Sequence, residues 1–255
     1  MRARLSQIVR RSDFARTLLD QYPVRIEQLG GEAVTGSRRI SRIFNHWYGN
    51  PETRTESTQS LEAYEGGDLV DVGAFHGWYA LLFAPKARPG DSFVELEPDG
   101  RAFSELLGNM QEISRWYPDI RLHTLPIAVG NGRPTRVEWP MGPDGHPSFS
   151  SDSTAGSDGA AGAPSTLTLD KLCETLKIKP TFVKIDVEGA EAFVLEGMDE
   201  VLDRYAPVVM LEVHPQWQPA NYSVEWLMER MKKHGYHDRE LCNQPLARRI
   251  LWRRG

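Results

Sequence analysis

Cysteine and long hydrophobic runs are scarce in this chain. It has 255 residues, of which only Cys173 and Cys242 are cysteines. We therefore expect no disulfide framework and a reducing compartment. There is no apolar run long enough to span a membrane and no secretory segment. These absences predict a cytoplasmic protein without a membrane span, and the length suits one large α/β domain with its own core.

An excess of positive charge is also missing. The formal net charge is −5, which argues against a general nucleic-acid binder. Arginines nevertheless gather in the first turns and in the tail, and apolar residues between Leu5 and Tyr22 fall close to one helical face. We expect an N-terminal amphipathic helix that packs on the main domain or on a second subunit. In the second case the protein would form a homodimer through this region. Contact with an anionic membrane or a carrier protein is the alternative.

Two fingerprints of nicotinamide enzymes are absent. The chain has neither a Gly-x-Gly-x-x-Gly segment nor a Tyr-x-x-x-Lys pair, which argues against a nicotinamide oxidoreductase. What the chain does have is an alternation of apolar strand-like runs with helix-like runs. Strands are expected at 69–72, 92–96, 120–122 with 125–129, 181–185 and 208–213, and two short ones near 236 and at 246–252. This alternation predicts a doubly wound parallel sheet with helices on both faces.

Composition also suggests how the chain is divided. Residues 1–64 are expected to form a helical or irregular N-terminal extension, and residues 65–255 the α/β domain. Within that domain, 148–165 is mostly Ser, Gly, Ala, Asp and Pro, a composition that buries too little apolar surface to offset its ordering entropy. We expect a flexible loop there, either a lid over the site or a plain insertion.

The first predicted strand-to-helix turn has the features of a nucleotide-type cofactor site. Gly73 and Gly77 let the backbone approach a ligand closely, next to a helix N-terminus. Asp71 would repel a pyrophosphate but suits an ammonium group. Glu97, about twenty residues past Gly77, can accept both hydroxyls of a ribose. A ligand with a ribose, a cationic amino-acid part and no phosphate is S-adenosylmethionine.

Polar residues also lie where two later strands end. Lys184, Asp186 and Glu188 follow one another at the end of one strand, and Glu212 and His214 end the next. Methylation of an alcohol needs a general base, and we expect His214 or Asp186 in that role. Glu188 and Glu212 would orient the base or hold substrate hydroxyls, and Lys184 would pair with Glu212. In the structural alternative, Lys184 and Glu212 form a buried ion pair and His214 caps its strand.

A metal site is the alternative interpretation of these side chains. Asp186, Glu188, Glu212 and His214 are hard ligands that suit Mg²⁺. No close ligand spacing within one segment supports a metal, so we do not favour one.

These segments resemble the FkbM-type S-adenosylmethionine-dependent methyltransferases over roughly residues 68–215. The resemblance implies a Rossmann-like class I methyltransferase fold and O-methylation of a sugar, a polyketide or another secondary metabolite. The matching blocks are Val70-Asp71-Val72-Gly73-Ala74, Glu97-Pro98-Asp99 with Asn109, Ala128-Val129-Gly130, Thr168-Leu169-Asp170, Lys184 through Glu191 with Val194-Leu195-Glu196-Gly197, and Glu212-Val213-His214. The implied cofactor-binding residues are Asp71, Gly73, Ala74, Phe75, Gly77, Glu97, Pro98, Asn109 and Ala128.

Two positions depart from the pattern of that family. Phe75 stands where the family usually has Asn, and Ala80 where it often has a small hydroxyl residue. The side-chain amide that would steady the methionine carboxylate is therefore missing, but backbone N–H groups could serve, and we expect cofactor binding to survive. If Phe75 instead obstructs the methionine pocket, the chain is a non-catalytic binding module.

The sequence indicates less about the acceptor than about the cofactor. The expected partner is a small hydroxylated molecule, and N-methylation stays open because an amine needs less help from a base. Several aromatic residues near predicted loops could hold a ring of the acceptor or belong to the core: Trp47, Tyr48, Trp78, Trp217 and Tyr222.

Overall fold

A seven-stranded sheet forms the centre of the computed structural model, in the order β10-β11-β9-β8-β3-β4-β5. The five strands from β9 to β5 are parallel, and β11 runs antiparallel to both of its neighbours. Their bounds are β3 Asp68–Val72, β4 Ser92–Leu96, β5 Arg121–Leu125, β8 Pro180–Ile185, β9 Val208–Val213, β10 Tyr236–Asn243 and β11 Arg248–Arg254. The predicted doubly wound α/β fold is confirmed, and two of the predicted strands, β4 and β9, have the bounds that the sequence gives.

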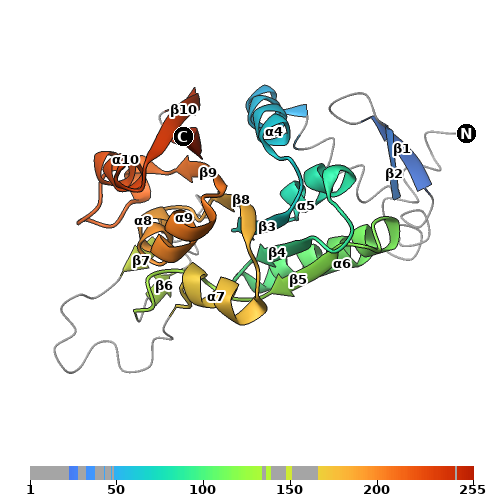
Figure 1. Cartoon of the computed structure of the whole chain (residues 1–255), viewed down its shortest axis with the longest axis horizontal. Helices are drawn as coiled ribbons and strands as arrows, with labels where there is room; N and C mark the ends of the chain where they lie inside the picture. Colours follow the sequence, from blue (N-terminus) through green and yellow to red (C-terminus); the bar gives the residue numbers. More distant parts are fainter. Residues whose placement is uncertain are drawn as a thin grey trace, which may run out of the picture.

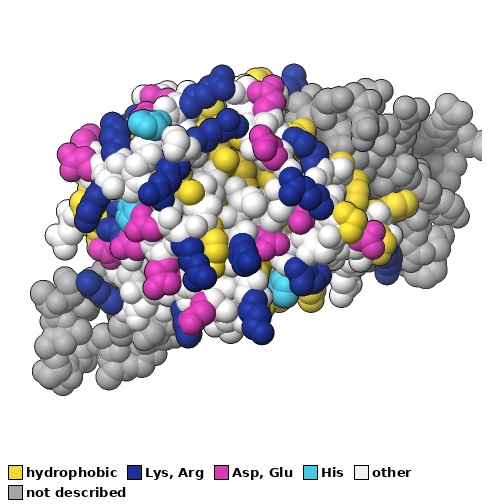
Figure 2. Space-filling model, viewed as in Figure 1, with side chains coloured by type: hydrophobic (Ala, Val, Ile, Leu, Met, Phe, Trp, Pro, Cys, Tyr) yellow, Lys and Arg dark blue, Asp and Glu magenta, His cyan; other side chains and the backbone are white. Residues whose placement is uncertain are grey.

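The structure describes residues 23–27, 33–37, 43, 47, 49–133, 136–138, 148–150, 166–244 and 246–255. Within these ranges no helix is long and apolar enough to cross a membrane. On the face shown in Figure 2, acidic and basic side chains are intermixed.

Helices cover both faces of the sheet (Figure 1). Strand residues alternate between two cores, so that Leu69, for example, belongs to one and Val70 to the other. The first face carries α4 Pro51–Ala63, α5 Trp78–Phe83 and α6 Gly100–Trp116, with the 3₁₀ turn η1 Ala84–Lys86 after α5. The second carries α7 Leu169–Leu176, α8 Glu191–Glu196, α9 Asp199–Tyr205 and α10 Val224–Lys233, and η2 Pro215–Trp217 follows β9.

Short polar side chains start three of these helices. The side chain of Asp99 accepts hydrogen bonds from the N–H groups of Arg101 and Ala102 at the start of α6, and Thr168 and Ser223 cap α7 and α10 in the same way. Between α8 and α9 the chain bends at Gly197, where a Cβ would lie 2.0 Å from the Gly130 carbonyl oxygen. The segment between β8 and β9 therefore forms two helices rather than one.

The first 64 residues differ from the expected helical or irregular extension. They include an antiparallel pair of strands, β1 Pro23–Glu27 and β2 Ala33–Ser37, as well as α4. The expected amphipathic helix up to Tyr22 lies outside the described residues. The boundary at residue 64 stays a prediction.

The segment predicted as a loop at 148–165 begins as a strand. β7 Ser148–Ser150 pairs antiparallel with β6 Arg136–Glu138. Residues 151–165, which make up the rest of that segment, lie outside the described residues.

Candidate active site

A cavity of about 580 Å³ opens at the carboxyl ends of β3, β4, β8 and β9. The sheet order reverses between β3 and β8, which is where open α/β sheets bind their ligands. Eleven of the predicted site residues line the cavity: Asp71, Gly73, Ala74, Phe75, Glu97, Pro98, Ala128, Lys184, Asp186, Glu188 and Glu212. Gly77, Asn109 and His214 are not part of this lining.

Gly73 brings the turn after β3 against the end of β8. Its φ is 82°, and a Cβ would lie 1.8 Å from the Asp186 carbonyl oxygen, so only glycine fits there. Asn109 acts at a distance from the cavity, because its Nδ2 donates to the His76 carbonyl at 2.8 Å and so holds the loop that leads to Gly77. Gly77 has φ 77°, and a Cβ there would meet Met110 Cε at 2.2 Å.

The backbone N–H groups of this turn are used within the protein. Those of Gly73 and Ala74 both donate to the Leu96 carbonyl at 3.0 Å, and that of Gly77 donates to Ala74 at 2.7 Å. The N–H of Phe75 donates to Glu97 Oε2 at 3.0 Å. These four groups are therefore not open donors for a methionine carboxylate, and the turn contributes a close approach of its backbone instead.

Glu97 is buried at the end of β4 and lines the cavity. Besides the Phe75 N–H on Oε2, its Oε1 accepts the Asp99 N–H at 2.9 Å. Burial raises the pKa of this carboxyl, and these two hydrogen bonds lower it. Each oxygen keeps a second lone pair, so the carboxylate can still accept two hydroxyl groups.

Lys184 lies among carboxylates at the centre of the site. Its Nζ is 3.2 Å from Asp186 Oδ2 and 3.6 Å from Asp71 Oδ1, and it donates to the Gly73 carbonyl at 3.1 Å. Burial lowers the pKa of Lys184, but the charges of Asp186 and Asp71 outweigh burial and keep the ammonium charged. The expected pairing of Lys184 with Glu212 is wrong, because Glu212 has a different cation.

The cation beside Glu212 is Arg249, on β11. Arg249 Nη2 lies 2.7 Å from Glu212 Oε1, and Arg249 Nε lies 2.9 Å from Glu56 Oε2 on α4. Tyr79 donates to the other oxygen of Glu56 at 2.6 Å. Burial raises the pKa of Glu212 to about 8, against the lowering effect of Arg249. Sequence reasoning missed Arg249 and Glu56, because no local motif marks them and only the β9–β11 pairing brings Arg249 opposite Glu212.

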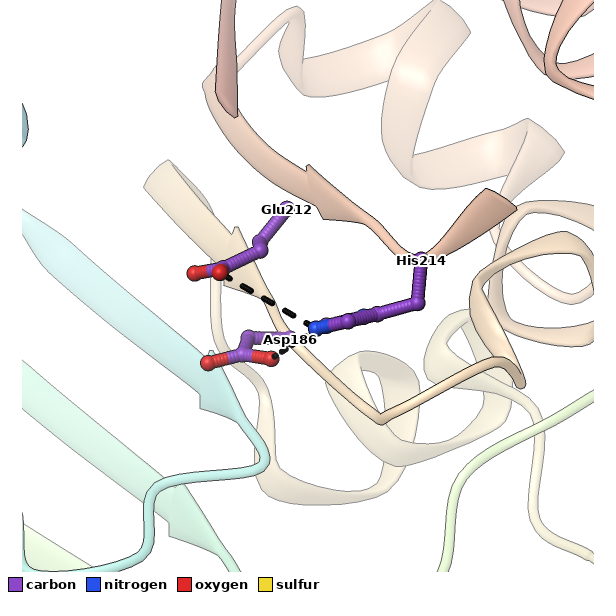
Figure 3. A group of neighbouring side chains, drawn as sticks. All are labelled: Asp186, Glu212 and His214. Atoms are coloured by element: carbon purple, nitrogen blue, oxygen red, sulfur yellow. Dashed lines mark ion pairs between the residues drawn. The ribbon is translucent and has the colours of Figure 1, made fainter. Parts of the chain in front are cut away.

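His214 follows β9 directly and is held from behind. Its Nδ1 lies 2.9 Å from Oε1 of the fully buried Glu191, and Gln218 contacts the other oxygen of Glu191. The Nε2 side of the ring faces Asp186 and Glu212 (Figure 3), and Nε2 lies 3.9 Å from one oxygen of each. It also lies 3.5 Å from Glu188 Oε2. Glu191 belongs to the block quoted for the family resemblance, but no sequence pattern indicates that it holds His214.

The charges around His214 decide its protonation. Burial lowers the pKa of His214, but the hydrogen bond and charge of Glu191, with the charges of Asp186 and Glu188, raise it to about 9. The ring is therefore protonated at neutral pH. Burial alone would raise the pKa of Asp186, but Lys184 and His214 hold it below its ordinary value. Of the two predicted bases, Asp186 is the one that is ionised at neutral pH and can accept a proton.

Asp186, Glu212 and His214 also form a group that could hold a metal ion. One ligand atom from each lies within 4.8 Å of the others. Two of the three are carboxylates that already face a cation, Lys184 for Asp186 and Arg249 for Glu212. A divalent cation would have to compete with these buried ion pairs.

The sheet order and the cavity at its switch point define a Rossmann-like methyltransferase fold. A crystal structure of methyltransferase FkbM from Methylobacillus flagellatus KT is similar, with a TM-score of 0.53 and 15% identity over 84% of this chain and 51% of that one. This chain thus spans about half of that structure. A precorrin-6y C5,15-methyltransferase from Geobacter metallireducens GS-15 is more distant, with a TM-score of 0.46 and 13% identity over 80% of this chain and 88% of that one.

A sequence match then gives the family. The model of the methyltransferase FkbM domain matches residues 71–237, which is more than half of the chain. The chain therefore belongs to the FkbM methyltransferase family. No curated protein matches it.

Proposed function

We propose that this chain methylates a hydroxyl of a small acceptor, such as a sugar, a polyketide or another secondary metabolite, with S-adenosylmethionine as the methyl donor. The observation that carries the proposal is the carboxylate of Asp186. It lines the cavity, it lies 3.2 Å from Lys184, and its pKa is held below the ordinary value. A base that is ionised at neutral pH thus stands beside the turn at Gly73.

The residues present fit this cofactor. The buried carboxylate of Glu97 suits a ribose diol, and Asp71 suits the ammonium group of the methionine part. Gly73 lets the turn after β3 lie directly against the end of β8, beside Asp186, where a Cβ would collide with the backbone. The apolar stretch Ile127, Ala128 and Val129 would face the adenine. When bound, S-adenosylmethionine supplies an electrophilic methyl group.

Asp186 has the task of taking the proton from the acceptor. A weak base is enough, because a hydroxyl oxygen that has begun to bond to the methyl carbon becomes positively charged and strongly acidic. Lys184 fixes one oxygen of Asp186, and protonated His214 lies 3.9 Å from the other. Glu188 and Glu212 line the same cavity and would hold further hydroxyls, which positions the acceptor for in-line attack.

N-methylation is the second candidate. Five carboxyl groups line the cavity on the side of Lys184: Glu56, Asp71, Asp186, Glu188 and Glu212. This concentration of acids would also attract a protonated amine. An amine acceptor must lose a proton before it attacks, so the same Asp186 would serve both reactions.

The first test is calorimetric titration of the purified protein with S-adenosylhomocysteine, with NADH as the control. Micromolar binding of S-adenosylhomocysteine without a response to NADH is the expected result. Failure to bind S-adenosylhomocysteine would overturn the cofactor assignment. The acceptor is then sought by mass spectrometry after incubation with S-adenosylmethionine and hydroxylated sugars, polyketides or amines, where methylation of amines alone would decide for the second candidate.

A further inference from the structure

Glu95 is a buried carboxyl group that the proposed mechanism does not use. It lies within β4, is fully buried and is not part of the cavity lining. Among the residues that the structure describes, none donates a hydrogen bond to either of its carboxyl oxygens. A buried carboxylate without a donor is strongly unfavourable, so this side chain has to carry a proton.

The hydrogen-bonding neighbour of Glu95 is Asp71 on β3. The two residues are paired in register on adjacent parallel strands, and β3 and β4 lie side by side in Figure 1. Asp71 is buried as well, and its Oδ1 has no hydrogen-bond partner within the described part of the chain. Two buried carboxyl groups in contact do not both ionise. A proton between them supplies the donor that both side chains lack.

The surroundings decide which of the two acids keeps the proton. Lys184 Nζ lies 3.6 Å from Asp71 Oδ1, which favours the charged form of Asp71. Burial raises the pKa of Asp71 to about 6, against the lowering effect of Lys184. Burial and the charge of Asp71 raise the pKa of Glu95 well above its ordinary value, and Lys184 opposes them less. At neutral pH Glu95 is therefore neutral and Asp71 is ionised.

Three further titratable groups surround Asp71. The charges of Asp186 after β8 and Glu97 after β4 raise its pKa. Tyr79 on α5 stays neutral, because burial and the charge of Glu56 raise the pKa of its hydroxyl well above the ordinary value. None of these groups donates to Glu95, so the O–H of Glu95 has Asp71 as its acceptor.

We propose that Glu95 is a positioning residue for the cofactor: as a neutral acid it donates its O–H to Asp71, and the Asp71 carboxylate, oriented and kept charged by this bond, receives the ammonium group of S-adenosylmethionine. This inference rests on the proposed cofactor. Glu95 acts only through Asp71, since Asp71 lines the cavity and Glu95 does not. A hydrogen bond to the charged form of an acid favours that form, so loss of the O–H should weaken cofactor binding near neutral pH.

The first experiment examines the protein without any ligand. The infrared difference spectrum between the wild type and Glu95→Gln at pH 7 should contain the carbonyl band of a protonated carboxylic acid. Glu212, with a pKa of about 8 because it is buried, is present in both proteins and cancels. A difference spectrum that contains only carboxylate bands would overturn the proposal.

The second experiment is calorimetric titration with S-adenosylhomocysteine at several pH values. Glu95→Leu removes the donor and leaves an apolar side chain of similar size, whereas Glu95→Gln keeps an N–H donor. Asp71→Asn identifies the part of the pH profile that Asp71 causes. Phe93→Leu, a packing change on the same face of β4, is the control for a merely structural effect. If Glu95→Leu does not fold, Glu95→Met takes its place.

We expect the binding of S-adenosylhomocysteine to the wild type to have its pH midpoint near 6, the pKa of Asp71, which burial raises. Loss of a hydrogen bond to a charged group should move the midpoint of Glu95→Leu upwards by about one to two pH units. The affinity then falls by about two- to tenfold at pH 7 and stays within about twofold of the wild type at about pH 8.5. Glu95→Gln and Phe93→Leu should keep the wild-type midpoint.

Three results of the titration would overturn the role of Glu95. They are a wild-type midpoint in Glu95→Leu, an equal shift in Glu95→Leu and Glu95→Gln, and a shift by Glu95→Leu that persists when Asp71 is already asparagine. Failure of the wild-type protein to bind S-adenosylhomocysteine at any pH would instead contradict the proposed cofactor. The infrared experiment does not depend on a ligand, so the two failures are distinguishable.

Discussion

Arg249 and Glu212 face each other across the antiparallel pair of β11 and β9, with Arg249 Nη2 2.7 Å from Glu212 Oε1. The same guanidinium reaches Glu56 on α4. Arg249 and Glu56 both lie outside residues 71–237, which match the family model. Two segments beyond that match thus complete the wall of the cavity and hold one of its carboxylates.

Replacing Arg249 by methionine should destabilise the protein. Burial raises the pKa of both Glu212 and Glu56, and the variant leaves these two buried acids without their shared cation. Because Glu212, with a pKa of about 8, is mostly protonated at pH 7, the cost is that of leaving buried polar groups without a partner, about 1–3 kcal/mol in the free energy of unfolding, measured by urea unfolding at pH 7. Arg249→Lys should recover part of the loss. The exposed Arg253 is the control, and its replacement by methionine should change the free energy by less than about 0.5 kcal/mol.

Gly73→Ala tests the close approach of the first turn to β8. The new Cβ would lie 1.8 Å from the Asp186 carbonyl oxygen at a φ of 82°, so the turn must move. We expect a loss of about 3 kcal/mol or more in the free energy of unfolding and weaker binding of S-adenosylhomocysteine. Gly100→Ala is the control, because a Cβ there meets nothing within 4 Å. Equal stability of the two variants would mean that the turn adapts and that its shape is not fixed by Gly73.

Stability should fall as the pH rises from about 6.5 to 9. The pKa of His214 is about 9 in the folded protein against an ordinary value of 6.5. Its stabilising effect is therefore complete below pH 6.5 and is lost as the pH rises through 9. Glu212 adds to the same trend, since its pKa of about 8 makes its ionisation in the folded protein unfavourable.

The expected loss from His214 is about 2–3 kcal/mol in the free energy of unfolding. It is measured by urea unfolding at several pH values in low salt. His214→Gln removes this titration and should make the fall above pH 6.5 shallower, leaving the part that comes from Glu212. A curve of unchanged slope in that variant would show that Glu191 does not raise the pKa of His214.

The strands of the sheet could be predicted because buried parallel strands appear as short apolar runs. Helix α4 could not, because its buried residues other than Ala63 are polar: Thr53, Glu56, Ser57 and Ser60. Their partners, such as Tyr79 for Glu56, come from other parts of the chain. On α6, Leu107 is 40% exposed although its neighbour Leu106 is buried, so an apolar residue type alone does not show which face of that helix packs on the sheet.

The site could be predicted as far as strand ends determine it. Asp71, Glu97, Asp186 and Glu212 line one cavity because the carboxyl ends of their strands lie side by side. Their pairing depends on side-chain direction across the sheet, which a sequence does not show. The protonation of His214 could not be predicted either, since it depends on Glu191 behind the ring.

Asp186→Asn should lower kcat and leave the cofactor bound. The amide keeps the shape of the side chain but cannot accept the proton of the acceptor, and the loss of a general base costs about 10²–10⁴ in rate. Binding of S-adenosylhomocysteine, followed by calorimetry, should change little. Glu188→Gln is the matched control on the same cavity wall, with a smaller expected loss. A variant at Asp186 that keeps the wild-type rate would contradict its role as base.

A divalent metal should not be needed for methyl transfer. Asp186 and Glu212 each face a buried cation, Lys184 at 3.2 Å and Arg249 at 2.7 Å, and His214 is protonated at neutral pH because its pKa is about 9. A metal would have to displace the protons of His214 and Glu212 and the ion pair of Asp186 with Lys184 in order to bind. We therefore expect activity to survive EDTA, and calorimetric titration with Mn²⁺ to show no binding tighter than about 1 mM. Micromolar Mn²⁺ binding that Asp186→Asn abolishes would instead identify the three side chains as ligands, and the proton-transfer role of Asp186 would then pass to another group in the cavity.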